Sequence, residues 1–311
     1  MAKIALAHLM TRRQVMAGAA LATAMIWTSP AVAQDWRAKY PTLVYAQGTN
    51  ENAGTKTAAL TPFVEYLSKR LGVNVQLRIV NDYAAVIEGQ RSGNIHIALH
   101  GGSSYARAIM TGVKIEPFVI DVYKDGTKGY YSVFYVRKDS PYQKIEDLKG
   151  KNIGLVDPNS ASGNTVPRYA LHRMKIDADK FFNKVVYTGT HENAVLALQQ
   201  GTVDVAANWW NNDSESNLAR MARNGLAKVD DYRIIFKSDL MAASPHTFSA
   251  DLPADMKAAI TQAFLDAHRD APEAFAKASN GGKPYERVTH ETYAPMIELN
   301  RFVDNLRRQR Q

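Results

Sequence analysis

The sequence contains no cysteine, so two structural options are closed. Without thiols the chain can form neither a disulfide framework nor a thiolate metal site, and the redox state of its compartment does not bear on the fold. Common catalytic signatures are missing as well. The chain has no P-loop, no G-x-G-x-x-G and no G-x-S-x-G nucleophile elbow. These absences argue against an enzyme built on any of those motifs.

Runs of basic residues interleaved with aromatic residues are also absent, apart from the basic tail 307–311. The formal net charge is +8, which is mild for a chain of 311 residues. Nucleic-acid binding needs a concentrated basic surface, so this composition argues against it. A mildly cationic protein is better suited to a small anionic ligand.

An apolar run at the N-terminus has the layout of a secretory signal. Three basic residues precede the apolar stretch 15–27, and an A-x-A pattern ends at Ala33. This order predicts cleavage after Ala33, so we expect residues 1–33 to be removed on export to the periplasm. Arg12 and Arg13 leave the twin-arginine route and the general export route both open. The alternative, a retained anchor, lacks a stop-transfer flank.

Short apolar strands alternate with amphipathic helices along the remaining 278 residues. Strands are expected at 42–46, 73–80, 95–99, 129–137, 151–156, 184–189 and 202–208. Helices are expected at 62–71 after a Thr61 cap, 83–93 after an Asp82 cap, 105–112, 166–174 and 192–201. This alternation predicts parallel sheets with helices on both faces.

The two halves of the chain repeat one β-α-β pattern. Residues 84–102 match residues 193–210 in kind: an apolar helix, Gln, Gly, a strand and then an abrupt polar or aromatic segment. Two copies predict an α/β fold of two lobes joined by two crossing strands. We assign residues 36–132 and 243–311 to lobe 1 and residues 133–242 to lobe 2. Such lobes close on a cleft by hinge motion.

The loop "DPNSASGN" follows the apolar run 153–156 and leads into a helix. Open α/β sheets bind ligands at the carboxyl ends of their strands, and a helix start offers unpaired N–H groups. Ser160 and Ser162, with the N–H groups of residues 161–164, can therefore form an uncharged cradle for a tetrahedral anion. The alternative is an ordinary turn in which one serine caps the helix.

His191 begins the helix of the second repeat, where Tyr83 stands in the first repeat. The two side chains can therefore meet across the cleft and donate to an anion, or else cap and pack. A zincin site needs a second histidine four residues after the first, and Val195 stands there. We therefore expect no metal and no cofactor. The motif "HGGS" at 100–103 is similar to an esterase oxyanion loop, but no nucleophile–base pair accompanies it.

Two tryptophans follow the strand 202–208. Neighbouring residues alternate faces, so one is expected in the core and the other, Trp210, on a ligand. Asp213 can pair with a ligand amine or cap a helix.

Taken together, these stretches resemble the periplasmic phosphonate-binding proteins of ABC transporters, and most of all those devoted to 2-aminoethylphosphonate. The matching stretches are "NDYAAVIEGQRSGNIHIALHG", "GYYSVFYVRKDSP", "DPNSASGNTVP" and "HENAVLALQQGTVDVAAN". The resemblance implies a type II periplasmic-binding-protein fold, an inner-membrane ABC permease with its ATPase as partner, and no catalysis. A monomer is expected.

The resemblance also implies the ligand contacts. The phosphonate group is expected at Tyr83, Ser160, Ala161, Ser162, Gly163, Thr190 and His191. The distal or amine end is expected at His100, Trp210, Asn211 and Asp213. Two carboxylates of the family are missing, because Asn211 and Ser244 stand at their positions, and His100 replaces a tyrosine. The amine must therefore be held differently, or the ligand lacks one. Phosphite, phosphate or another alkylphosphonate is the alternative ligand, and an enzyme on the same fold is the alternative from another class.

Overall fold

The computed structural model describes residues 35–48, 53–80 and 82–308. The chain separates into two units, Met1–Asp35 and Trp36–Gln311, and both β-sheets lie in the second unit. The predicted signal segment 1–33 lies outside the described residues. Within the described part, no helix combines the length and the apolar character that crossing a membrane requires.

The strands are β1 Thr42–Gly48, β2 Asn74–Val80, β3 Ile97–Leu99, β4 Ile115–Val122, β5 Gly129–Arg137, β6 Asn152–Leu155, β7 Lys184–Tyr187, β8 Val205–Asn212, β9 Glu215–Ser216, β10 Tyr232–Lys237, β11 Met241–Ala242, β12 Pro245–Ser249 and β13 Lys283–Arg287. The α-helices are α1 Trp36–Lys39, α2 Ala53–Leu71, α3 Tyr83–Arg91, α4 Gly102–Met110, α5 Val166–Arg173, α6 Ala178–Phe181, α7 His191–Gln199, α8 Asn217–Arg223, α9 Ala254–Asp270, α10 Pro272–Ala278 and α11 Ala294–Arg308. Shorter turns are η1 Ile145–Leu148, η2 Ala161–Thr165, η3 Val229–Asp231 and η4 His290–Tyr293, of which η2 is a π-helical turn.

The two sheets repeat one strand order. The first sheet runs β13-β4-β12-β3-β1-β2 and the second runs β10-β5-β8-β6-β7. In each sheet three parallel strands, β2-β1-β3 or β7-β6-β8, are followed by an antiparallel strand, β12 or β5. This confirms the predicted α/β fold with two sheets and parallel β-α-β units. We call the first sheet with its helices lobe 1 and the second lobe 2.

The chain passes from one sheet to the other before each of the antiparallel strands β5 and β12. Strand β5 follows β4 of lobe 1 and pairs with β8, whereas β12 follows the strands of lobe 2 and pairs with β3 and β4. The predicted division of the chain into lobes, with its residue boundaries, stays a prediction.

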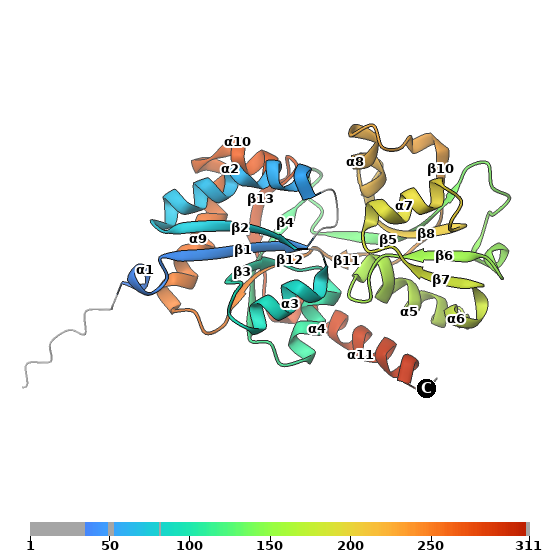
Figure 1. Cartoon of the computed structure of the whole chain (residues 1–311), viewed down its shortest axis with the longest axis horizontal. Helices are drawn as coiled ribbons and strands as arrows, with labels where there is room; N and C mark the ends of the chain where they lie inside the picture. Colours follow the sequence, from blue (N-terminus) through green and yellow to red (C-terminus); the bar gives the residue numbers. More distant parts are fainter. Residues whose placement is uncertain (1–34, 49–52, 81, 309–311) are drawn as a thin grey trace, which may run out of the picture. The chain divides into compact units, whose positions relative to one another are not determined.

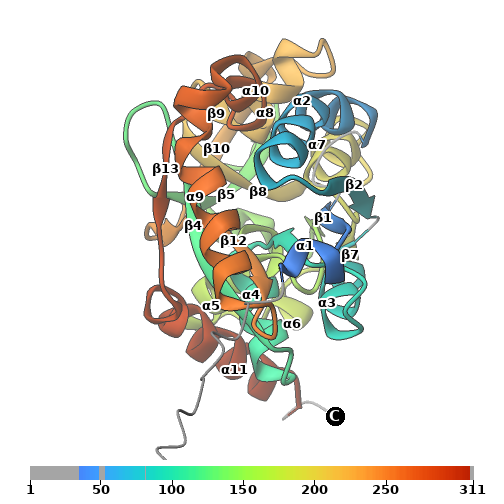
Figure 2. The same ribbon diagram turned by 90° about the vertical axis from the view of Figure 1, so that its left-hand side faces the viewer.

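Helices cover both faces of each sheet, as Figure 1 shows for lobe 2, with α7 and α8 on one face and α5 and α6 on the other. Leu198 and Leu218 pack in the core on the first face, and Leu171 and Ala178 pack in the core on the second. In lobe 1 the larger core joins α2, α9 and α10 to the sheet. The last helix, α11, lies beside α4, away from α2 and α10 (Figures 1 and 2).

Two helix starts differ from the sequence prediction. Helix α2 begins at Ala53 rather than after Thr61, because Thr57 and Thr61 donate their hydroxyls to carbonyls four residues back and so stay within the helix. Helix α4 begins at Gly102, so Ser103 and Ser104 are helical rather than part of a loop. The Asp82 cap of α3 is confirmed, with the carboxylate accepting from the N–H of Ala85.

Candidate functional site

A cavity of about 190 Å³ lies between the two lobes, at the carboxyl ends of the parallel strands. Each of the six parallel strands contributes to its lining, through a residue of the strand itself or of the segment that follows it. From lobe 1 these are Gln47, Tyr83 and Gly101, and from lobe 2 they are Ser160–Ser162, His191 and Trp209. The general position of the site therefore follows from strand polarity alone.

The turn η2 presents Ser160, Ala161 and Ser162 to the cavity. Ser160 Oγ accepts from the N–H of Gly163 at 3.0 Å, so the helix-capping alternative is confirmed for this residue. The Ser162 carbonyl accepts a 2.7 Å hydrogen bond from Ser132 Oγ, which fixes the turn against β5. The N–H groups of Ala161 and Ser162 are the first of the turn and have no carbonyl within it. A ligand role for these residues stays a prediction.

Tyr83 and His191 occupy equivalent places, each as the first residue of its helix, and both line the cavity. Burial raises the pKa of Tyr83 above its usual range, and a hydrogen bond with Ser160 opposes the rise. The Tyr83 hydroxyl is therefore a neutral donor and links lobe 1 to the turn of lobe 2. The carbonyl of His191 accepts from Asn208 Nδ2 at 2.9 Å, which anchors the start of α7 to β8.

Two residues predicted for the phosphonate end are not among those lining the cavity. Thr190 caps α7, where its Oγ1 accepts from the N–H of Asn193 at 3.0 Å. Gly163 packs against the end of β6, since a Cβ there would lie 2.4 Å from the Cβ of Val156. Both residues position the residues beside them rather than facing the cavity.

His100 does not reach the cavity either. Its Nε2 donates to Gln90 Oε1 at 2.7 Å, and its Nδ1 lies 3.1 Å from Ser104 Oγ. The side chain is buried, and burial lowers the pKa of His100 to about 3. His100 is thus a neutral core residue between α3 and α4, so it supplies no charge for a distal ligand group.

The three remaining distal-end candidates also lie outside the lining. Strand β8 continues through Asn212, and its alternation puts Trp209, not Trp210, on the cavity. Trp210 packs on Tyr131 instead. Asn211 donates to Asp125 at 3.4 Å and ties β8 to the segment that connects β4 to β5. Asp213 is exposed in the turn between β8 and β9.

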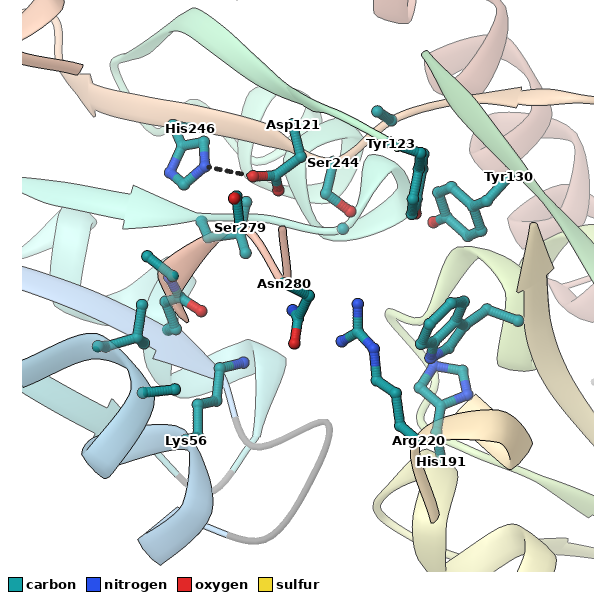
Figure 3. Close-up of a pocket in the computed structure, with 18 of the residues that line it drawn as sticks. Lys56, Asp121, Tyr123, Tyr130, His191, Arg220, Ser244, His246, Ser279 and Asn280 are labelled. Carbon is teal, nitrogen blue, oxygen red and sulfur yellow. Dashed lines mark ion pairs between the residues drawn. The ribbon is translucent and has the colours of Figure 1, made fainter. Parts of the chain in front are cut away.

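Asp121 is a cavity residue that the sequence analysis missed (Figure 3). It lies on β4, and its Oδ1 is 3.7 Å from Nε2 of the buried His246. Gln47 donates to the hydroxyl of Tyr45, which lies 3.2 Å from His246 Nδ1 and can donate to it. This series of hydrogen bonds directs the Nε2–H of His246 toward the carboxylate of Asp121. The signal in the sequence is a single acidic residue inside the apolar strand "FVIDV".

Buried tyrosine hydroxyls surround this carboxylate. Burial, and then the charge of Asp121, raises the pKa of Tyr45 and of Tyr285. Tyr123 and Tyr285 line the cavity together with Asp121. A carboxylate among aromatic rings is a favourable site for an ammonium group.

Cationic side chains line the cavity as well, and no pattern in the sequence predicts them. They are Lys56 of α2, Arg220 of α8 and Lys277 of α10. Lys56 Nζ donates to the carbonyl of Gly48 at 2.9 Å. The Arg220 guanidinium lies 4.7 Å from the Trp209 ring centroid and 3.3 Å from Glu215. In the described part of the chain, no three His, Cys, Asp or Glu side chains are grouped closely enough to hold a metal ion.

Comparison with known families gives one match over most of the chain. Residues 49–293 match the model of a family described as "ABC transporter, phosphonate, periplasmic substrate-binding protein". The phosphonates-binding periplasmic protein of Escherichia coli K12 is 30% identical over 248 residues, which cover 78% of this chain and 71% of that protein. The phosphate-import protein PhnD of Mycolicibacterium smegmatis is 29% identical over 212 residues, covering 65% and 64%.

Solved structures share the fold. A binding-protein component of an ABC phosphonate transporter from Pseudomonas aeruginosa superposes with a TM-score of 0.75 and 25% identity, covering 84% of this chain and 86% of that one. PhnD1 of Prochlorococcus marinus, solved with methylphosphonate, gives a TM-score of 0.72 at 19% identity, covering 85% and 98%. With the strand order described above, these matches establish the type II periplasmic-binding-protein fold.

Proposed function

The chain belongs to the periplasmic substrate-binding proteins of phosphonate ABC transporters, and we propose that its interlobe cavity binds 2-aminoethylphosphonate for delivery to a permease. The observation that best supports this is that one cavity has an uncharged hydrogen-bonding turn on one side and a carboxylate on the other. The uncharged turn η2 lies on lobe 2, and the carboxylate of Asp121 lies on lobe 1.

The phosphonate group is assigned to η2. Its oxygens accept from the N–H groups of Ala161 and Ser162 and from the hydroxyls of Ser162 and Tyr83. His191 faces the same cavity and supplies a further ring N–H. Dipoles fixed in a partly buried site hold an oxyanion without the cost of desolvating a paired cation.

The ammonium group is assigned to Asp121. This residue takes the place of the family carboxylates that are missing at Asn211 and Ser244. Ser244 itself lines the cavity, so a small residue there leaves room beside Asp121 (Figure 3). The ammonium then contacts the rings of Tyr123 and Tyr285. Contacts from one ligand to both lobes stabilise the closed arrangement over the open one.

Calorimetry of the purified protein tests this assignment. 2-Aminoethylphosphonate is expected to bind more tightly than methylphosphonate, phosphite or phosphate. Asp121→Asn should weaken binding of 2-aminoethylphosphonate about ten- to hundred-fold, the usual cost of a lost charge-assisted hydrogen bond. The same variant should change methylphosphonate binding little. Asp251→Asn, at an exposed carboxylate on lobe 1, is the matched control.

Ser162→Ala tests the other end of the ligand. It should weaken every phosphonate about ten-fold or more, because each loses the same hydroxyl. Ser160→Ala should in addition lower the free energy of unfolding by about 1 kcal/mol, the usual cost of removing an N-cap. If phosphate binds best, the assignment of 2-aminoethylphosphonate as the ligand is wrong, but the family membership is unaffected. If Ser162→Ala binds like the wild type, the phosphonate lies elsewhere.

Export, partner and activity complete the proposal. We propose that residues 1–33 direct export to the periplasm, by the twin-arginine or the general route. The protein then acts as a monomer that meets an inner-membrane permease, and it turns over no substrate. The mass of the protein recovered from the periplasm checks cleavage after Ala33, and replacing Arg12 and Arg13 by lysine separates the routes.

A further inference from the structure

The turn η2 belongs to lobe 2 and also contacts lobe 1. It packs on β5 and β8 of its own sheet and on α4 and α11 of lobe 1. The N–H of Thr165 donates to the carbonyl of Ser160 at 3.0 Å and closes the π-helical turn. Ala161 and Ser162, the assigned donors for the phosphonate, lie between these two residues. A shift of Thr165 therefore moves the ligand-binding turn.

Three buried polar side chains join this turn to lobe 1. Ser103 Oγ of α4 lies 2.7 Å from Thr165 Oγ1 and donates to Asn300 Oδ1 of α11 at 2.6 Å. Asn300 Nδ2 donates to the carbonyl of Met296 at 2.8 Å, which identifies Oδ1 as the acceptor for Ser103. Ser103, Thr165 and Asn300 each have at most 2% of their surface exposed, and none of them lines the cavity.

The directions of these hydrogen bonds follow from the number of protons. A serine hydroxyl has one proton, and that of Ser103 is donated to Asn300. The hydroxyl of Thr165 must therefore donate to Ser103 Oγ. The series runs from lobe 2 to lobe 1 through a buried region, and each donor in it has an acceptor. Removing one member leaves buried polar groups without partners, which is more costly than losing an exposed hydrogen bond.

We propose that Ser103 and Thr165 are positioning residues that hold the phosphonate-binding turn against lobe 1 when the lobes close. This inference rests on the proposed function and extends it to residues that do not touch the ligand. Opening of the lobes separates α4 from η2 and breaks the hydrogen bond between Thr165 and Ser103. The bond therefore stabilises the closed arrangement alone. A ligand that is held by both lobes gains from it, whatever group stands at the distal end of the ligand.

Calorimetry with methylphosphonate, 2-aminoethylphosphonate and phosphate tests the proposal. Thr165→Val keeps the shape of the side chain and removes its hydroxyl, so it should weaken all three ligands by the same factor, about three- to ten-fold. Thr165→Ser keeps the hydroxyl and should bind each ligand within about two-fold of the wild type. Stopped-flow measurements of tryptophan fluorescence should show that Thr165→Val speeds dissociation and changes the association rate little.

Ser103→Ala removes the acceptor of Thr165 and the donor to Asn300 at once. It should therefore weaken binding of the three ligands more than Thr165→Val does. The double variant Ser103→Ala with Thr165→Val should bind no more weakly than Ser103→Ala alone, because the two residues act through one hydrogen bond. Effects that add in full would show that the two residues act independently and would overturn the proposal.

Thr261→Val is the matched control. The Thr261 hydroxyl is also buried, but it donates to the carbonyl of Lys257 within α9 at 2.8 Å. This variant should leave all three affinities unchanged, and thermal melting verifies that each variant is folded. The proposal is overturned if Thr165→Val binds like the wild type, if it weakens one ligand alone, or if Thr165→Ser is weakened equally. In these cases the proposed function stands; it falls, and this inference with it, if the wild type binds neither phosphonate.

Discussion

Ser160 and Ser162 stand two residues apart in one turn and have different roles. The side chain of Ser160 caps the turn, because its Oγ accepts a hydrogen bond from the N–H of Gly163. Ser162 contributes its carbonyl to Ser132 and presents the rest of the residue to the cavity. A sequence pattern rich in hydroxyls therefore located the turn, but it could not divide structural from ligand-facing serines. That division depends on the direction of single side chains.

His100 makes stability depend on pH. In the folded protein burial lowers its pKa to about 3, whereas a histidine in an unfolded chain has a pKa of about 6.5. Between these values the unfolded chain binds a proton that the folded protein does not bind. Stability is therefore highest above about pH 6.5, and each unit of acidification in that window costs up to about 1.4 kcal/mol.

His100→Gln removes this proton linkage and can still hydrogen-bond Gln90. Its melting temperature should fall less than that of the wild type between pH 7 and pH 4.5. His268→Gln, at an exposed histidine of α9, should follow the wild-type curve. Parallel curves for wild type and His100→Gln would show that His100 is not the group that titrates.

At the level of elements, the helix that begins with η2 and continues as α5 depends on close packing at its start. The Val156 N–H donates to the carbonyl of Gly163 at 2.9 Å, which joins the end of β6 to the turn. No side chain fits at Gly163, where a Cβ would lie 2.4 Å from Val156 and 2.8 Å from Ser160 Oγ. The glycine therefore sets how near the uncharged donors lie to the sheet.

Gly163→Ala should lower the free energy of unfolding by about 1–3 kcal/mol, the usual cost of overpacking, and should weaken phosphonate binding. Gly102→Ala is the control, since a Cβ there meets Met296 at an ordinary 3.6 Å. Denaturant unfolding and calorimetry of both variants measure the difference. Equal stabilities would mean that the turn can shift without cost.

The β-α-β units were predictable, and the cavity only in part. Hydrophobic period, the Asp82 cap and strand polarity located seven strands, five helices and the edge of each sheet that lines the site, but not strand β4, which carries Asp121. Trp210 was expected to face the ligand, whereas Trp209 lines the cavity. The sequence analysis ended the strand before these residues, because nothing local shows that β8 continues to Asn212. Asp121 and Arg220 were missed because they reach the cavity from β4 of lobe 1 and α8 of lobe 2, and no local pattern shows that these elements meet there.

At the level of the whole molecule, α11 connects the lobes outside the cavity. Asp304 Oδ1 accepts a 2.8 Å hydrogen bond from Arg107 of α4, and Asn300 accepts from Ser103. On the other lobe, the ring of Phe302 lies 5.5 Å from Tyr169 and 5.0 Å from His172 of α5. We predict that closure of the lobes moves α5 along this aromatic contact while α11 stays fixed to α4.

Phe302→Ala should loosen the contact with α5 by about 1 kcal/mol, because only part of the ring is buried. Amide exchange in residues 302–308 should then be about five-fold faster. Arg301→Ala is the control, since Arg301 is exposed and pairs with Glu298 of the same helix. Unchanged exchange in Phe302→Ala would mean that α4 alone holds the helix.

The exchange of strands between the lobes also determines the order in which the chain can be completed. Strand β12 lies between β3 and β4, yet it is made after every strand of the second sheet. A chain that ends after Lys237 contains all of the β10-β5-β8-β6-β7 path but has a gap inside the first sheet. The lobe whose synthesis begins first is thus finished last, and nascent or truncated forms expose the unpaired edges of β3 and β4.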